Sequence, residues 1–173
     1  MKERIRLASG ALLVLAVAAI GAALTGGAHA SPPDAVQAAK AASARFHSIQ
    51  QAEAAGYVLA SPCVSSPAGG MGFHYENPVL MADDTIDPAQ PEILVYAPKA
   101  DGELQLVAIE YWKRDADGSL LTDGDLPSVL GQAFDGPMPG HSPVMPVHYD
   151  LHVWVYEANE SGTFAQFNPA VTC

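Results

Sequence analysis

The sequence predicts an α+β fold in which one N-terminal amphipathic helix packs on a small, mostly antiparallel sheet. Three observations lead to this prediction. Apolar residues recur at helical spacing after Asp34, two strand-like runs flank a turn at residues 98–103, and a further strand-like run fills residues 146–156. The order is therefore helix, loop, hairpin, irregular loop, strand and a short return, without any internal repeat.

Residues 1–30 have the pattern of a secretory signal peptide. A basic start precedes an apolar run from Leu12 to Leu24, and Ala28-His29-Ala30 then gives a small-x-small cleavage pattern. The rest of the chain, residues 31–173, has a suitable length for a single globular domain. We therefore expect a secreted protein, in the periplasm or outside the cell envelope, with no stable membrane anchor after cleavage.

The chain that follows the signal peptide is strongly acidic. Residues 31–173 contain five Lys and Arg residues against eighteen Asp and Glu residues, which gives a net charge of −13. Such a charge argues against nucleic acid as a partner, because the phosphates would be repelled. It is compatible with a metal ion or a small molecule as partner, and it also serves the solubility of an exported protein.

Cys63 and Cys173 are the two cysteines of the chain. An even number of cysteines in an oxidising compartment predicts a disulfide. In the chain-entropy view, closing a loop of about 110 residues stabilises the fold by about 4–5 kcal/mol. The alternative function for the two thiols is to bind a metal ion as thiolates.

The helix is expected over residues 34–55. Asp34 can cap its start, and Gly56 ends it. His47 lies off the apolar stripe and is expected to be a solvated helix residue. The stripe itself comprises Val36, Ala39, Ala42, Phe46 and Ile49.

Residues 60–72 predict a glycine-rich loop, which lacks the Lys-Ser/Thr ending of a phosphate-binding loop. Its glycines are expected to allow positive φ or a close approach of the backbone. His74 follows directly, which is a common position for a site residue on a loop. The alternative is a histidine that hydrogen-bonds to the local backbone.

Residues 92–97 and 104–112 predict the two strands of a hairpin. Both faces of the second strand are apolar, so that Glu110 should be at least half buried. A buried carboxylate is costly unless it is paired, bound to a metal ion or protonated. Because basic residues are scarce here, Glu110 is a candidate site residue.

Residues 126–146 contain five prolines and predict an irregular loop that brings His141 close to the last long strand. In that strand, at residues 146–156, His148, Asp150 and His152 share one face. Positions four apart on a strand are separated by roughly 13 Å. His148 and His152 therefore could not share one ion without a bulge. Residues 163–167 should return as a short strand or extended segment.

Three segments resemble a family of small exported bacterial proteins. They are Gly69-Gly70-Met71-Gly72-x-His74-Tyr75-x-Asn77-Pro78, Gly136-Pro137-Met138-Pro139-Gly140-His141, and Pro146-Val147-His148-Tyr149-Asp150-Leu151-His152-Val153-Trp154. The resemblance covers most of residues 31–173. It implies a shared exported domain without an established activity, and it assigns no site residue.

The leading hypothesis is an exported metal-binding protein that handles copper or zinc. Imidazoles and carboxylates are common ligands of such ions. The candidate ligands are His74, His141, His148 and His152, with Glu110 or Asp150. Nearby thioethers would favour copper, and Met71, Met138 and Met145 lie close in sequence. Such a site requires at least three of the four histidines to converge.

Two other classes of function remain open. Three histidines with a carboxylate could hold a catalytic zinc ion, and a His–carboxylate pair could catalyse hydrolysis by acid/base chemistry. Either enzyme would need an open cleft at the histidines. A metal-free binding or structural module would instead show each histidine hydrogen-bonded to a separate backbone group.

Overall fold

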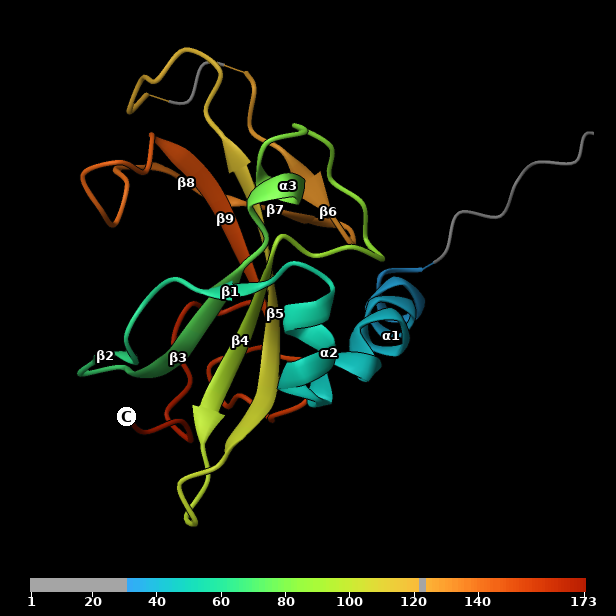
Figure 1. Ribbon diagram of the computed structural model, residues 1–173. Helices are drawn as coiled ribbons and strands as arrows, with labels where there is room; N and C mark the ends of the chain where they lie inside the picture. Colours follow the sequence, from blue (N-terminus) through green and yellow to red (C-terminus); the bar gives the residue numbers. More distant parts are fainter. Residues whose placement is uncertain (1–30, 122–123) are drawn as a thin grey trace, which may run out of the picture.

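The computed structural model describes residues 31–121 and 124–173, so that the signal peptide predicted at residues 1–30 lies outside the described residues (Figure 1). Seven strands form the main sheet, in the order β1-β3-β4-β5-β9-β8 with β2 also paired to β3. Every pairing in this sheet is antiparallel. None of the helices within the described ranges is long and apolar enough to cross a membrane.

The elements have the following bounds. The helices are α1 (Pro32–Ser43), the 3-10 helix η1 (Ala44–His47), α2 (Ile49–Ala54) and α3 (Pro78–Met81). The strands of the main sheet are β1 (Val58–Leu59), β2 (Val64–Ser66), β3 (Gly69–Glu76), β4 (Ile93–Pro98), β5 (Leu104–Arg114), β8 (Asp135–Met138) and β9 (His148–Val153). A small second sheet consists of β6 (Ser128–Val129) and β7 (Gln132–Ala133).

The predicted combination of N-terminal helix and mostly antiparallel sheet is confirmed, but the helix is not continuous over residues 34–55. It is divided into α1, η1 and α2. Ser48 has an extended backbone and its side chain accepts a hydrogen bond from the backbone N–H of Gln51, so it caps a new helix. Helical periodicity continues through such a break, which is why the sequence pattern did not show it.

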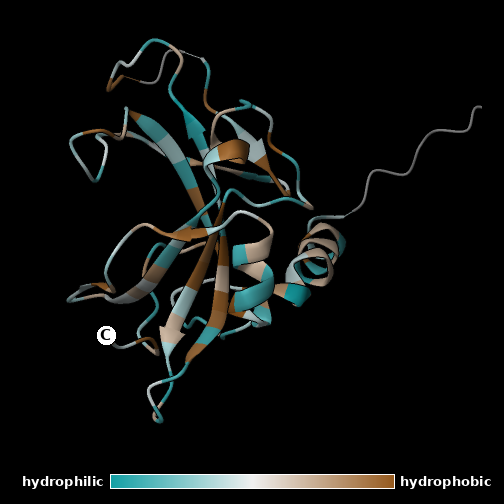
Figure 2. Ribbon diagram, viewed as in Figure 1, coloured by the Kyte–Doolittle hydropathy of each residue, from teal (hydrophilic) through white to brown (hydrophobic). Residues whose placement is uncertain are grey.

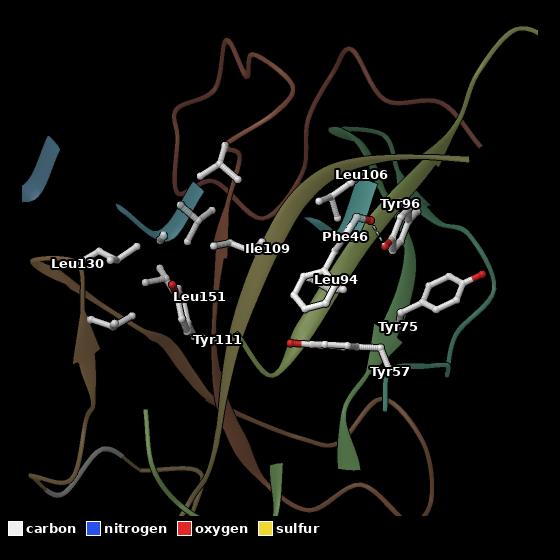
Figure 3. Packing of buried hydrophobic residues seen from close by; sticks show 14 of the residues in the cluster. Phe46, Tyr57, Tyr75, Leu94, Tyr96, Leu106, Ile109, Tyr111, Leu130 and Leu151 are labelled. Atoms are coloured by element: carbon white, nitrogen blue, oxygen red, sulfur yellow. Dashed lines mark hydrogen bonds between the residues drawn. The ribbon is translucent and has the colours of Figure 1, made fainter. Parts of the chain in front are cut away.

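The helices cover one face of the sheet, beside β5 in Figure 1. The core on this face combines Phe46 of η1 and Ala52 of α2 with aromatic and aliphatic side chains of the strands (Figure 3). The Tyr96 hydroxyl donates a hydrogen bond of 2.5 Å to the Phe46 carbonyl, which ties β4 to η1. Figure 2 shows β4 and β5 as the most hydrophobic strands, as expected for central strands.

The opposite face of the sheet is only partly apolar. A small cluster there contains Val95, Ala97, Val107, Ala108, Trp154 and Val171. Val171 belongs to the C-terminal segment, which runs back along β3 through reciprocal backbone hydrogen bonds between Gly70 and Asn168. Beyond this cluster, the same face carries histidines and carboxylates.

The glycine-rich segment is a strand, not the predicted loop, since β3 begins at Gly69. Its glycines allow other backbone segments to approach. A Cβ on Gly69 would lie 2.3 Å from the Asn168 carbonyl oxygen, and a Cβ on Gly72 would lie 2.4 Å from that of Tyr96. The predicted close approach is thus confirmed, and it occurs inside a sheet.

Two further expectations were wrong in part. Residues 126–146 are not wholly irregular, because they contain β6, β7 and the edge strand β8. An edge strand tolerates Pro137, since one side of it makes no ladder hydrogen bonds. Residues 163–167 form turns instead of a strand, although the Thr163 carbonyl accepts a hydrogen bond from the Trp154 backbone N–H.

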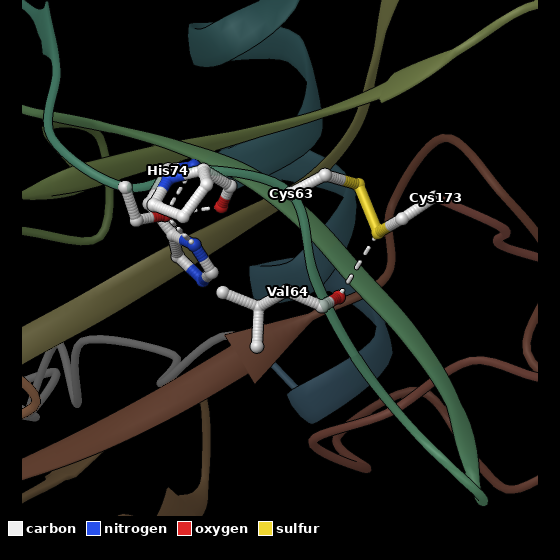
Figure 4. The surroundings of a disulfide bond; sticks show 6 residues. Cys63, Val64, His74 and Cys173 are labelled. Carbon is white, nitrogen blue, oxygen red and sulfur yellow. Dashed lines mark hydrogen bonds between the residues drawn. A yellow bond between two sulfur atoms is a disulfide. The ribbon is translucent and has the colours of Figure 1, made fainter.

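The Cys63–Cys173 disulfide is confirmed, with a sequence separation of 110 residues. It joins the segment before β2 to the end of the chain. Figure 4 shows His74 of β3 beside the segment that contains Cys63. The disulfide is consistent with an oxidising compartment.

Candidate metal centres

Polar residues of three strands meet on the sheet face opposite the helices. Glu110 of β5 lies directly across from His152 of β9, and Trp112 lies across from Asp150. Directly paired residues of neighbouring strands point to the same face. His74 belongs to β3 and comes within reach of Glu110 across the intervening strand β4.

The first set, here named the central group, consists of His74, Glu110 and His152. The Oε2 atom of Glu110 lies 3.4 Å from Nε2 of His74 and 3.4 Å from Nε2 of His152. The two imidazole rings have centroids 5.8 Å apart and are nearly perpendicular. All three side chains are buried, with exposed fractions of 11%, 4% and 1% respectively.

Ser61 orients the His74 ring. Its hydroxyl lies 2.9 Å from Nδ1 of His74, accepts a bond from the His74 backbone N–H, and donates to the Pro62 carbonyl. When the Pro62 carbonyl accepts the single hydrogen of the hydroxyl, Nδ1 of His74 is the donor to Ser61. The lone pair of His74 then lies on Nε2, which faces Glu110.

The central group contains polar atoms that no hydrogen bond satisfies. Among the described residues, Oε2 of Glu110 and both ring nitrogens of His152 have no hydrogen-bond partner. Burial lowers the pKa of His152 well below its usual value and that of His74 to about 4. Burial also raises the pKa of Glu110 well above its usual value. The two imidazoles are therefore neutral at pH 7, so that neither contact is an ion pair, and burial disfavours a charge on Glu110 as well.

The second set, here named the outer group, consists of His141, His148 and Asp150. His148 and Asp150 come from β9, and His141 comes from the loop between β8 and β9. The His148 and His141 rings have centroids 5.1 Å apart, and Nε2 of His148 lies 3.9 Å from Oδ2 of Asp150. His148 and Asp150 are buried, whereas His141 is exposed.

The surroundings also orient His148. Its Nδ1 lies 3.0 Å from the Pro146 carbonyl oxygen, which can only accept, so Nδ1 is protonated and Nε2 carries the lone pair. Its ring stacks on Trp112 at a centroid distance of 5.7 Å. Burial raises the pKa of Asp150 to about 7, the charge of Asp135 adds to this rise, and Gln166 opposes it. Among the described residues, no hydrogen bond of good geometry reaches either Asp150 oxygen.

The histidines thus form two pairs, each with a carboxylate, and not one cluster. The predicted requirement that three histidines converge is not met, because His148 and His152 lie too far apart along β9 and belong to different groups. Two histidines with one carboxylate are nevertheless a ligand set found in zinc sites. Sequence reasoning did not identify Ser61 or Trp112, since only the pairing of strands brings them to His74 and His148.

Glu92 is a third buried carboxylate with a raised pKa, at about 8, and burial is the main cause. Its Oε2 accepts a hydrogen bond from the Trp112 backbone N–H at 3.1 Å. Between about pH 4.5 and pH 8, the folded protein therefore retains a proton on Glu92 that the unfolded chain releases. Its contribution to stability is complete below about pH 4.5 and is lost as the pH rises towards 8.

We therefore expect the free energy of unfolding of Glu92→Gln to fall less than that of the wild type between about pH 5 and pH 8. Each pH unit in which only the folded state retains the proton costs about 1.4 kcal/mol. Urea unfolding at several pH values measures the difference. Parallel pH curves for the two proteins would show that Glu92 ionises normally in the folded state.

Two pockets of the described residues lie away from both groups. One is lined by residues that include Lys40, His47 and Tyr156, and the other by residues that include Arg45 and Tyr57. His47 is exposed, as predicted, and its ring contacts Tyr156 edge-on. Neither pocket forms a cleft at the central group.

Comparisons of the chain with protein-family models, with curated proteins and with solved structures found no match. The resemblance of the three sequence segments to small exported bacterial proteins therefore stays a prediction.

Proposed function

We propose that this is an exported metal-binding protein, which holds a divalent late transition metal ion at the central group. The convergence of His74 Nε2, His152 Nε2 and Glu110 Oε2 carries this proposal, since these buried atoms lie together without hydrogen bonds between them. Unsatisfied buried polar atoms are costly. A bound cation would satisfy all three at once.

The distances suit a small ion. Zinc binds nitrogen and oxygen ligands at about 2 Å in tetrahedral geometry, which places two ligand atoms roughly 3.3 Å apart. The observed separation is 3.4 Å for both histidine–glutamate pairs. Two imidazoles and one carboxylate suit zinc and also copper(II), so either ion is a candidate.

Two features support export. Residues 1–30 have the sequence pattern of a signal peptide. The Cys63–Cys173 disulfide is of a kind that persists in oxidising compartments. Metal binding by this protein would therefore take place outside the cytoplasm.

Burial favours holding or transferring an ion over catalysis. Three protein ligands leave a fourth position of a tetrahedral ion open, as in catalytic zinc sites. However, the central group has side-chain exposures of only 1–11%, and the two pockets described above are lined by other residues. A substrate of ordinary size would not reach the ion without a rearrangement.

The decisive experiment is elemental analysis of untagged protein lacking residues 1–30, loaded in parallel with copper and with zinc. We expect the wild type to retain metal after gel filtration and His152→Asn to lose at least one equivalent. His47→Asn is the matched control, because His47 is exposed and lies outside both groups. Equal metal content in His152→Asn and the wild type, or no metal in either preparation, would exclude the proposal.

Ser61→Ala should weaken metal binding while leaving the ligands in place. Without the hydroxyl, Nδ1 of His74 loses its acceptor, and the ring orientation and tautomer are no longer fixed. Loss of such a supporting bond typically reduces metal affinity by about 10–100-fold. Competition with a chelator of known affinity measures the change. Ser65→Ala, at an exposed position of β2, should bind like the wild type.

A further inference from the structure

We propose that the outer group is a second metal site, facing the solvent, through which ions reach the central group. This inference rests on the proposed function of the central group. It assigns His141 and His148, with Asp150, to an accessible site for the same class of ion. It also assigns an order to the two sites, with the outer group filled first.

The outer group has the composition and the unsatisfied atoms of a site. It provides two imidazoles and one carboxylate, and ligand atoms of all three residues lie within 4.8 Å of one another. Asp150 is fully buried, and within residues 31–121 and 124–173 neither of its oxygens receives a hydrogen bond of good geometry. The Pro146 carbonyl holds His148 with its Nε2 lone pair free for an ion.

Exposure distinguishes the two groups. The side chains of His74, Glu110 and His152 are almost completely covered, whereas His141 is exposed. His141 lies on a loop that contains Pro143 and Pro146 and joins β8 to β9. An ion from the solvent therefore meets His141 before any other residue of the two groups.

The two groups are close enough for direct transfer. Asp150 and His152 are two positions apart on one face of β9, a separation of about 7 Å along a strand. The neighbouring strand β5 has the same spacing, since Glu110 lies across from His152 and Trp112 lies across from Asp150. No other strand lies between the two groups on β9. An ion could exchange outer ligands for central ones without returning to the solvent.

Two measurements test this inference. The first is the Zn²⁺ stoichiometry of the metal-free protein, which should be two for the wild type and one for His141→Ala. The second is the rate of Zn²⁺ transfer from a chromophoric chelator, followed by stopped flow. In His141→Ala, Zn²⁺ should bind to the central group at least tenfold more slowly than in the wild type. The equilibrium affinity of the central group for Zn²⁺ should be unchanged. His47→Ala should match the wild type in both measurements.

Asp150→Asn provides a second test with little change in shape, and circular dichroism checks its folding. We expect it to behave like His141→Ala. If the folded variants bind as much Zn²⁺ as the wild type, or take it up as fast, the proposal of an outer site is wrong. The proposal of metal binding at the central group would not be affected. No Zn²⁺ in the wild type, or undiminished Zn²⁺ in His152→Asn, would instead overturn the proposed function and the transfer with it.

Discussion

Glu110→Gln should make the metal-free protein more stable at neutral pH and remove the stabilisation that a metal ion at the central group supplies. The two effects have opposite signs, and both follow from one carboxylate. Glu110 is buried between two neutral imidazoles, and its two histidine contacts are the only ion-pair geometries it makes among the described residues. A glutamine has a similar shape and no charge to bury.

The stability effect depends on pH. Burial, reinforced by the charge of Asp150, raises the folded-state pKa of Glu110 well above its usual value of 4.5. The contribution of Glu110 to stability is therefore complete below about pH 4.5 and is lost as the pH rises. Glu110→Gln should match the wild type near pH 4 and become progressively more stable than the wild type as the pH rises to 7, measured by urea unfolding.

Bound metal should stabilise the wild type more than it stabilises Glu110→Gln. An ion present at a hundred times its dissociation constant stabilises a folded protein by about 2.7 kcal/mol. We expect the central group to supply this gain in the wild type and not in Glu110→Gln, because an amide is a poor replacement for a carboxylate ligand. Any stabilisation by an ion at the outer group should remain in Glu110→Gln. Thermal unfolding with and without Zn²⁺ measures it.

Glu92→Gln is the matched control, since Glu92 is a buried carboxylate with a raised pKa outside both groups. It should share the gain of stability at neutral pH and retain the full response to Zn²⁺. A Glu110→Gln protein that is still stabilised by Zn²⁺ as strongly as the wild type would show that Glu110 is not a ligand.

The strands of the hairpin and the alternation of β9 could be predicted from the sequence, because their residue types and period reflect burial on both faces. The same alternation placed His148, Asp150 and His152 on one face, and the scarcity of basic residues singled out Glu110. These inferences depend only on local sequence, and the structure agrees with them.

The grouping of the histidines could not be predicted in this way. It depends on the sheet order, which places β3, β4, β5 and β9 side by side, and on the register that sets Glu110 across from His152. The glycines of β3 gave a misleading local signal. Gly69 and Gly70 allow the distant C-terminal segment to approach closely, and Gly72 allows Tyr96 of β4 to do so, so a strand there resembled a loop.

Removal of the disulfide should cause the largest loss of stability. The bond closes a loop with a sequence separation of 110 residues. In the chain-entropy model, a loop of that length contributes about 4–5 kcal/mol. The double variant Cys63→Ser/Cys173→Ser should lose that amount in urea unfolding, and added reductant should leave its unfolding curve unchanged. A loss below about 1 kcal/mol would mean that other contacts already restrain both segments in the unfolded chain.

The same variant should also bind metal more weakly while it is still folded. Cys63 lies two residues after Ser61, whose hydroxyl orients His74, and Cys173 ends the segment that pairs with Gly70 of β3. Without the bond, Ser61 is less firmly held, so the affinity should fall in the same direction as in Ser61→Ala. Combining Ser61→Ala with the double cysteine variant separates the two causes. If the disulfide acts on the metal through Ser61, the triple variant should bind no more weakly than Ser61→Ala alone, whereas additive losses would place its effect elsewhere.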